Sequence, residues 1–199
     1  MKKKKRRMAI ILLTILSSLC LVFAFNKNRG LKVSGYDYDQ VTVDFIHTIG
    51  EDAKVIADEY GLYPSVMIAQ AVLESQSGQS SLSANYNNLF GIKGAYNGAS
   101  VTMQTWEDDG EGNAYTIDAA FRSYPSVSES LEDYAVLLTS SSYYIDTWRV
   151  NTASYQDATA ALTGTYATDT QYDEKLNALI EYYGLTIYDD LPQEELATE

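Results

Sequence analysis

Apolar residues recur every three or four positions over most of the chain beyond residue 40, which is the spacing of amphipathic helices. The pattern predicts five helices, over residues 41–60, 65–77, 127–138, 154–162 and 170–183. Gly61 and Gly78 follow the first two, and glycine commonly ends a helix. Pro64 begins the second, and Ser126 with Glu129 forms the capping-box pattern that begins the third.

In one region, apolar and polar residues alternate, and the three- to four-residue spacing of helices is absent. Residues 101–106 and 115–124 are rich in β-branched and aromatic side chains, and the second run alternates apolar with polar positions. Residues 108–113, Asp-Asp-Gly-Glu-Gly-Asn, lie between the two runs and form a strong turn signal. The sequence therefore predicts a β-hairpin inserted in a helical domain, an α+β fold that is mainly helical.

Charge separates the N-terminus from the rest of the chain. Eight of the 14 Lys and Arg residues precede residue 30, and the remainder of the 199-residue chain holds 6 basic against 27 acidic residues. A domain this acidic repels the phosphates of nucleic acids, and we therefore expect no nucleic-acid partner. The length suits one globular domain, which we expect to be a monomer.

The N-terminus carries a targeting signal. A basic run over residues 2–7 precedes residues 8–25, which are 18 residues without a charge. That length favours an uncleaved membrane anchor, while a signal peptide cleaved after Ala24 stays open. In both cases the basic flank keeps the N-terminus in the cytoplasm and predicts that the rest lies outside it. The expected organisation is this N-terminal part over 1–29, a linker over 30–40, one domain over 41–187 and an acidic tail over 188–199.

The predicted helix over residues 65–77 is apolar in nearly every direction, which is typical of a buried helix. Gln70, Glu74 and Ser77 nevertheless share one face, because they follow at i, i+4 and i+7. A carboxyl group against apolar walls retains its proton, and this suits a general acid. Taken alone, the pattern favours a structural glutamate, since perturbed carboxylates mark functional sites only statistically.

The hairpin supplies further acidic side chains, Glu107, Asp108, Asp109 and Glu111. Glu107 ends a strand, where a side chain can be aimed, whereas the others fall in the turn. A solvated acidic hairpin tip explains them equally well. The sequence also holds 17 tyrosines and two tryptophans, whose rings pack on sugars, so carbohydrate is favoured over lipid or nucleic acid as a ligand.

Four blocks of sequence resemble, in the same order, those of the family 73 glycoside hydrolases, which are bacterial N-acetylglucosaminidases that cut peptidoglycan. The blocks are residues 64–74 with Ser75 and Gly78, 88–94 (Asn-Leu-Phe-Gly-Ile-Lys-Gly), 121–124 with residues 129–134, and 165–169 with Tyr172. They lie within about residues 43 to 184. Four blocks in register are far stronger evidence than any single one.

The resemblance implies a lysozyme-like domain with a small β-hairpin lobe. It implies hydrolysis of the β-1,4 bond between N-acetylglucosamine and N-acetylmuramic acid in peptidoglycan. It makes Glu74 the general acid. The second catalytic carboxylate of the family matches Glu107 best, with Asp108, Asp109 and Glu111 still open. The expected partners are peptidoglycan glycan strands and, through the N-terminal segment, the membrane. The enzyme would be anchored to the cell membrane or secreted to the cell wall.

The remaining positions carry weaker expectations. Tyr166 matches the functional tyrosine of the family and is expected to help position the sugar acetamido group or a water. Asn88 and Phe90 are expected to line the cleft, with core packing equally open for Phe90. His47 is the only histidine, so neither a metal nor another cofactor is expected. A muramidase or lytic transglycosylase of the lysozyme-like class stays open, and so does a non-catalytic wall-binding domain.

Overall fold

A computed structural model of the chain describes residues 30–33, 36–108 and 114–190. The apolar segment over residues 8–25, Asp109 and Glu111 lie outside these ranges. In the part of the chain that is described, no helix is long and apolar enough to cross a membrane.

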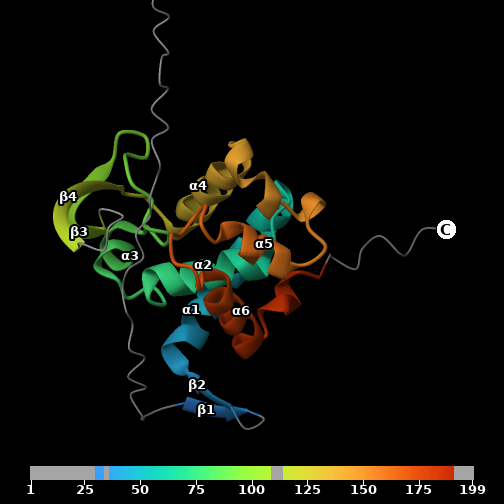
Figure 1. Ribbon diagram of the computed structural model, residues 1–199. Coiled ribbons are helices and arrows are strands. Elements are labelled where there is room, and N and C mark those ends of the chain that lie inside the picture. Colours follow the sequence, from blue (N-terminus) through green and yellow to red (C-terminus); the bar gives the residue numbers. More distant parts are fainter. Residues whose placement is uncertain (1–29, 34–35, 109–113, 191–199) are drawn as a thin grey trace, which may run out of the picture.

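The domain is mainly helical with two small antiparallel hairpins. Its α-helices are α1 (Gln40–Tyr60), α2 (Pro64–Ser75), α3 (Ser81–Tyr86), α4 (Val127–Thr139), α5 (Tyr155–Leu162) and α6 (Tyr172–Tyr183). Its strands are β1 (Gly30–Val33), β2 (Tyr36–Asp39), β3 (Ser100–Asp108) and β4 (Ala114–Arg122), and 3₁₀ turns occupy η1 (Ser142–Thr147), η2 (Arg149–Asn151) and η3 (Leu185–Tyr188). Figure 1 shows α2 at the centre of the helices and the β3–β4 hairpin to one side. The predicted mainly helical α+β fold is confirmed.

Local signals set most helix ends. Gly61 ends α1 in the left-handed conformation at φ 68°, as predicted. Ser126 begins α4 by accepting a hydrogen bond from the Glu129 amide at 3.3 Å. A second capping box, formed by Ser154 and Asp157, begins α5. These side chains satisfy amides that the first turn of a helix leaves unpaired.

The predicted end of α2 is wrong by two residues. The helix ends at Ser75 because Gln76 and Ser77 both take the left-handed conformation at φ 54°. The Ser75 hydroxyl donates to the Ala71 carbonyl at 2.5 Å and accepts from the Gly78 amide at 2.7 Å, which stabilises this early exit. Ser77 therefore leaves the polar face that it was expected to share with Gln70 and Glu74.

The centre of the core is α2 itself. Ten of its 12 residues are buried, so the prediction of a buried helix is confirmed. Fully buried side chains from the surrounding helices enclose it, among them Ile49 of α1, Leu131 of α4, Leu162 of α5 and Leu176 of α6. In a helix enclosed in this way, only polar side chains near the ends can reach water.

Two segments outside the expected domain boundaries are structured. Within the expected linker, β1 pairs with β2 so that Leu31 lies opposite Tyr38, and Gln40 already belongs to α1. The apolar and aromatic residues alternate there, as they do in strands. Residues 188–190, expected in the tail, also pack against the domain.

Asp189 caps α2 from a distant part of the chain. Its carboxylate accepts hydrogen bonds from the Ser65 amide at 2.8 Å and from the Ser65 hydroxyl at 2.7 Å. Tyr63, which precedes the helix, supplies no side-chain cap. Because a carboxylate at a helix N-terminus also opposes the helix dipole, this contact stabilises the start of α2.

Two further side chains, Arg149 and Lys54, hold the segment that carries Asp189. Arg149 donates to the Asp189 carbonyl, and its guanidinium lies 3.2 Å from an Asp58 carboxylate oxygen. Lys54 donates to the carbonyls of Tyr188 at 3.0 Å and Asp190 at 2.7 Å. The expected boundary after residue 187 therefore falls short of the last packed residues.

We predict that Asp189→Ala lowers the free energy of unfolding by about 1–3 kcal/mol, because the Ser65 amide loses its acceptor. Asp189→Asn should lose less, since its amide oxygen can still accept and burial already raises the pKa of the Asp189 carboxyl. Urea unfolding measures both. Asp190→Ala is the matched control, because its side chain is exposed; an equal loss in that variant would contradict the cap.

Candidate active site

Glu74 lies in the last turn of α2 and is the one acidic residue of that helix. Its side chain is partly exposed, whereas the preceding turns of α2 are buried. The Tyr172 hydroxyl of α6 donates a hydrogen bond of 2.6 Å to Glu74 Oε1. The carboxyl group thus has one oxygen bound to the protein and lies where α2 approaches the surface.

Burial raises the pKa of Glu74 from 4.5 to about 7. The hydrogen bond from Tyr172 and the positive charge of Lys175 act in the opposite direction, since both favour the ionised form, but desolvation is the larger effect. A carboxyl group with this pKa holds its proton in a large share of molecules at neutral pH. That is the requirement for a general acid.

A buried chain of hydrogen bonds continues behind Tyr172. The Gln70 amide Nε2 donates to the Tyr172 hydroxyl oxygen at 3.0 Å, and the Tyr134 hydroxyl donates to Gln70 Oε1. Gln70 and Tyr172 are 0% exposed and Tyr134 is 1% exposed, so these three side chains are shielded from bulk water. Gln70 and Glu74, predicted to share a face of the helix, both contact the same hydroxyl.

Sequence reasoning did not assign a role to Tyr172 or Tyr134. Tyr172 belongs to the fourth resembling block, and that was the available signal for it. Tyr134 lies in α4 and belongs to the third resembling block, which was the signal available for it. Their contact with α2 spans 98 and 64 residues of sequence, which no local pattern reveals.

Tyr166 is buried behind the same chain. It is 1% exposed, and its hydroxyl donates to the Phe90 carbonyl at 3.0 Å. Its ring centre lies 6.1 Å from those of both Tyr134 and Tyr172. The hydroxyl therefore has a backbone acceptor, and its expected role toward the sugar acetamido group or a water stays a prediction.

Asn88 and Phe90 also have internal partners. Asn88 accepts from the Ile92 amide at 3.1 Å and donates to the carbonyls of Ile92 at 3.0 Å and Arg122 at 2.8 Å. Phe90 is 0% exposed and stacks on Tyr134 with ring centres 4.1 Å apart. Both side chains therefore have structural partners within the domain, and their contact with a ligand stays a prediction.

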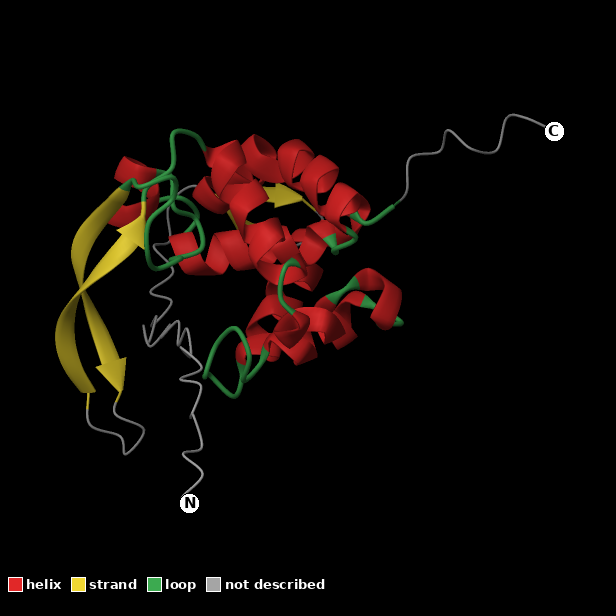
Figure 2. Ribbon diagram, turned by 90° about the horizontal axis from the view of Figure 1, so that it is seen from above, coloured by secondary structure: helices red, strands yellow, loops and turns green. Residues whose placement is uncertain are grey.

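Glu107 lies at the end of β3, where the sequence predicted it. It pairs with Tyr115 of β4. Asp108, which was expected in the turn, is instead the last residue of β3 and pairs with Ala114. Figure 2 shows that this end of the hairpin extends beyond the helices. Asp109 and Glu111 fall outside the described residues, so the identity of the second carboxylate stays a prediction.

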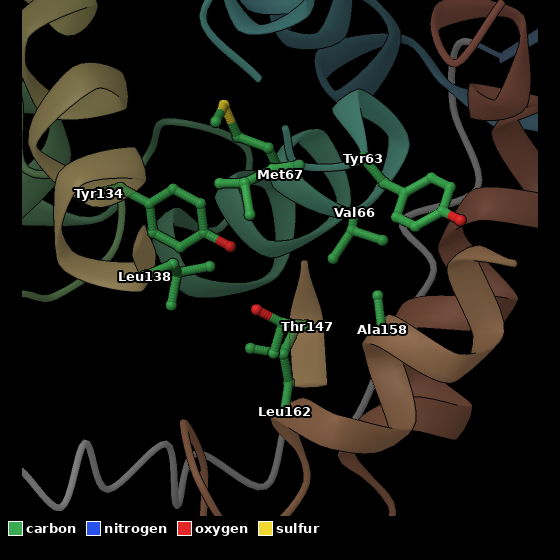
Figure 3. Close-up of a pocket in the computed structure, with 9 residues that line it drawn as sticks. Tyr63, Val66, Met67, Tyr134, Leu138, Thr147, Ala158 and Leu162 are labelled. Carbon is green, nitrogen blue, oxygen red and sulfur yellow. The ribbon is translucent and has the colours of Figure 1, made fainter. Parts of the chain in front are cut away.

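A small cavity lies between α2, α4 and α5 (Figure 3). Its walls are mainly apolar and include Val66, Met67, Leu138 and Leu162, together with the ring of Tyr134. It has room for about one water molecule, so it cannot hold a sugar. Elsewhere in the described ranges, no three His, Cys, Asp or Glu side chains lie close enough together to hold a metal ion.

A family model described as mannosyl-glycoprotein endo-beta-N-acetylglucosaminidase matches residues 50–185, which is more than half of the chain. The chain therefore belongs to this glucosaminidase family, and the resemblance to the family 73 glycoside hydrolases is confirmed. Glu74, Tyr166 and Tyr172 all lie within the matched range.

Relatives of known name agree with this assignment. The chain is 38% identical to the exo-glucosaminidase LytG of Bacillus subtilis over 199 residues, covering 96% of this chain and 70% of LytG. It is 52% identical to a probable N-acetylmuramidase of Lactococcus lactis over 73% of this chain. It spans about a third of that protein, 34% of its length.

A solved structure confirms the lysozyme-like fold. The catalytic domain of the autolysin Auto from Listeria monocytogenes superimposes with a TM-score of 0.71 at 52% identity. The match covers 77% of this chain and 90% of that domain.

We predict that Glu74→Gln changes how stability depends on pH. Below about pH 4.5 the carboxyl is protonated in the folded and unfolded states alike. Between pH 4.5 and 7 the unfolded chain ionises first, so the raised pKa costs the folded state stability as pH rises. Relative to Glu74→Gln, the wild-type free energy of unfolding should fall by about 1–3 kcal/mol between pH 4 and pH 8. Urea unfolding of both proteins would show this, and a difference that is constant with pH would contradict it.

Proposed function

We propose that this protein hydrolyses the β-1,4 bond between N-acetylglucosamine and N-acetylmuramic acid in bacterial peptidoglycan, with Glu74 as the general acid. The observation that carries the proposal is the Glu74 carboxyl, whose pKa burial raises to about 7 and whose Oε1 accepts a 2.6 Å hydrogen bond from Tyr172. Membership of the glucosaminidase family supports the same reaction class.

The chemistry asks two things of Glu74 in succession. It must first carry a proton to the leaving glycosidic oxygen, which the raised pKa permits near neutral pH. It must then bear a negative charge, and the Tyr172 hydroxyl already donates to the oxygen on which that charge develops. Because the donor is fixed before the reaction, no reorganisation is needed as the proton leaves.

Glu107 is the proposed second carboxylate. A glycosidase of this kind commonly uses one on the opposite side of the scissile bond, to activate a water or to stabilise the developing cation. The pairing of Glu107 within β3 supports this assignment, although Asp108 is paired in the same strand. Asp108, Asp109 and Glu111 are the alternatives.

Tyr166, Asn88 and Phe90 are proposed to help bind the substrate by holding the wall of the site in place. Tyr166 holds the Phe90 carbonyl, and Asn88 ties the same loop to the end of β4. Phe90 in turn stacks on Tyr134, which belongs to the chain behind Glu74. These residues would fix the wall of the site against which a sugar is positioned.

Replacement of the two carboxylates tests the roles. Glu74→Gln should lower kcat on purified peptidoglycan by at least about a hundredfold, because an amide has no proton to donate at this step. Glu107→Gln should also lower kcat, while the adjacent Asp108→Asn should retain most activity. Undiminished digestion by Glu74→Gln would exclude Glu74 as the acid, and a reversed order of the two hairpin variants would move the second carboxylate to Asp108.

The ends of the released fragments identify the bond. The names of the relatives differ on it, since one is an exo-glucosaminidase and another a probable N-acetylmuramidase. We expect fragments with reducing N-acetylglucosamine ends in mass spectrometry. Reducing muramic ends would indicate a muramidase, and anhydro-muramic ends would indicate a lytic transglycosylase.

We further propose that the N-terminal segment holds the enzyme at the outer face of the cytoplasmic membrane. The support is its sequence, 18 uncharged residues after a basic run. A relative from Enterococcus faecalis named autolysin is consistent with action outside the cytoplasm. In fractionated cells the protein should stay with membranes and retain residues 1–29. An N-terminus beginning at Phe25 would establish a cleaved signal instead.

A further inference from the structure

The hydrogen bonds behind Glu74 all run in one direction. The Tyr134 hydroxyl donates to Gln70 Oε1, Gln70 Nε2 donates to the Tyr172 oxygen, and the Tyr172 hydroxyl donates to Glu74 Oε1. A phenol has one proton and can donate only one hydrogen bond. A neighbour that donates to the Tyr172 oxygen cannot also accept that proton, so the proton goes to another acceptor. Gln70 therefore determines where the Tyr172 proton points.

We propose that Gln70 is a positioning residue for the general acid: its amide, held in one orientation by Tyr134, keeps the Tyr172 hydroxyl proton directed at Glu74 Oε1. This inference rests on the proposed function of Glu74. It assigns to the reaction a side chain that is 0% exposed and whose amide bonds Tyr172 and Tyr134.

The orientation of the Gln70 amide has a physical cause. If the amide were turned over, its oxygen would accept from Tyr172 and draw that proton away from Glu74. Its NH₂ group would then meet the Tyr134 oxygen, and the Tyr134 proton would lose the acceptor it has in the buried chain. Leaving a buried donor unpaired costs about 1–3 kcal/mol, which favours the observed orientation.

The groups around Glu74 are suited to this role. The titratable and charged side chains that act on Glu74 or feel its charge are Tyr134 of α4, Tyr166 before α6, and Tyr172 and Lys175 of α6. Burial raises the pKa of all three tyrosines well above its ordinary value, so they remain donors throughout the working pH range. Lys175 also binds Asp169, which holds its charge near the site.

The pH profile of kcat/KM separates positioning from packing. A donor to the ionised acid lowers its pKa, so loss of that donor raises it. In Tyr172→Phe the alkaline limb should therefore move up by about one pH unit, with a tenfold or greater fall in kcat. Tyr134→Phe should move the limb in the same direction, because it frees the Gln70 amide to turn over and accept the Tyr172 proton. Gln70→Met, which keeps the volume but removes the amide, leaves Glu74 as the acceptor for that proton. It should produce a smaller shift, because the Tyr172 hydroxyl loses only the donor that polarises it.

A double-mutant cycle tests whether Gln70 acts through Tyr172. The double variant Gln70→Met/Tyr172→Phe should show no shift beyond that of Tyr172→Phe alone. Met67→Leu is the matched control, because Met67 is buried on the same helix one turn earlier and takes no part in the chain. It should leave the alkaline limb in place.

Several results would overturn the inference. A lower kcat with an unmoved alkaline limb in both Gln70→Met and Tyr134→Phe would reduce Gln70 to packing, and additive shifts in the double variant would mean that it acts independently of Tyr172. If Gln70→Met does not fold, the shift in Tyr134→Phe decides the question. The ¹³C shift of the Glu74 carboxyl, followed against pH in the full chain, reports its pKa without catalysis. It keeps the inference testable even if Glu74→Gln remains active and the proposed acid is wrong.

Discussion

The structure depends on one constraint: a carboxyl group at the end of an otherwise enclosed helix must be stabilised by the protein. The helix α2 is apolar on nearly all sides because α1, α4, α5 and α6 surround it. The polar face that Glu74 shares with Gln70 therefore requires partners from those neighbours, since unpaired polar groups in the interior are costly. Tyr172 and Tyr134 meet this requirement, and the same two contacts join α6 and α4 to the centre of the domain.

Both ends of α2 are fixed by residues distant in the sequence. At the start, Asp189 binds Ser65, while Arg149 and Lys54 hold the segment that carries it. At the other end, Ser75 turns the chain out of the helix and Tyr172 binds Glu74. The acid thus lies on an element that is held at two points, and its position relative to the rest of the site follows from the packing of the whole domain.

Sequence patterns predicted the parts of this arrangement that depend on neighbouring residues. Helical spacing, the glycine at the end of α1, the cap of α4 and the β3–β4 hairpin are local features, and all were found. The end of α2 was misplaced because a serine hydroxyl, and not Gly78, determines it. Contacts over long separations were missed: the Asp189 cap spans 124 residues, and Tyr172 meets Glu74 across 98. The burial of Asn88 was also missed, because a motif shows which residues recur and not which way they face.

The rod-like connection between the two ends of α2 has a consequence for adaptation. Ser65 and Glu74 are nine residues apart in α2, which is roughly 14 Å along the axis of a rigid helix. Loosening the C-terminal segment would release the start of the helix that carries the acid at its other end. Stabilising substitutions can lower activity where the active site needs flexibility. In this domain the two properties share residues, so variants selected for heat tolerance and variants selected for turnover should converge on the same positions.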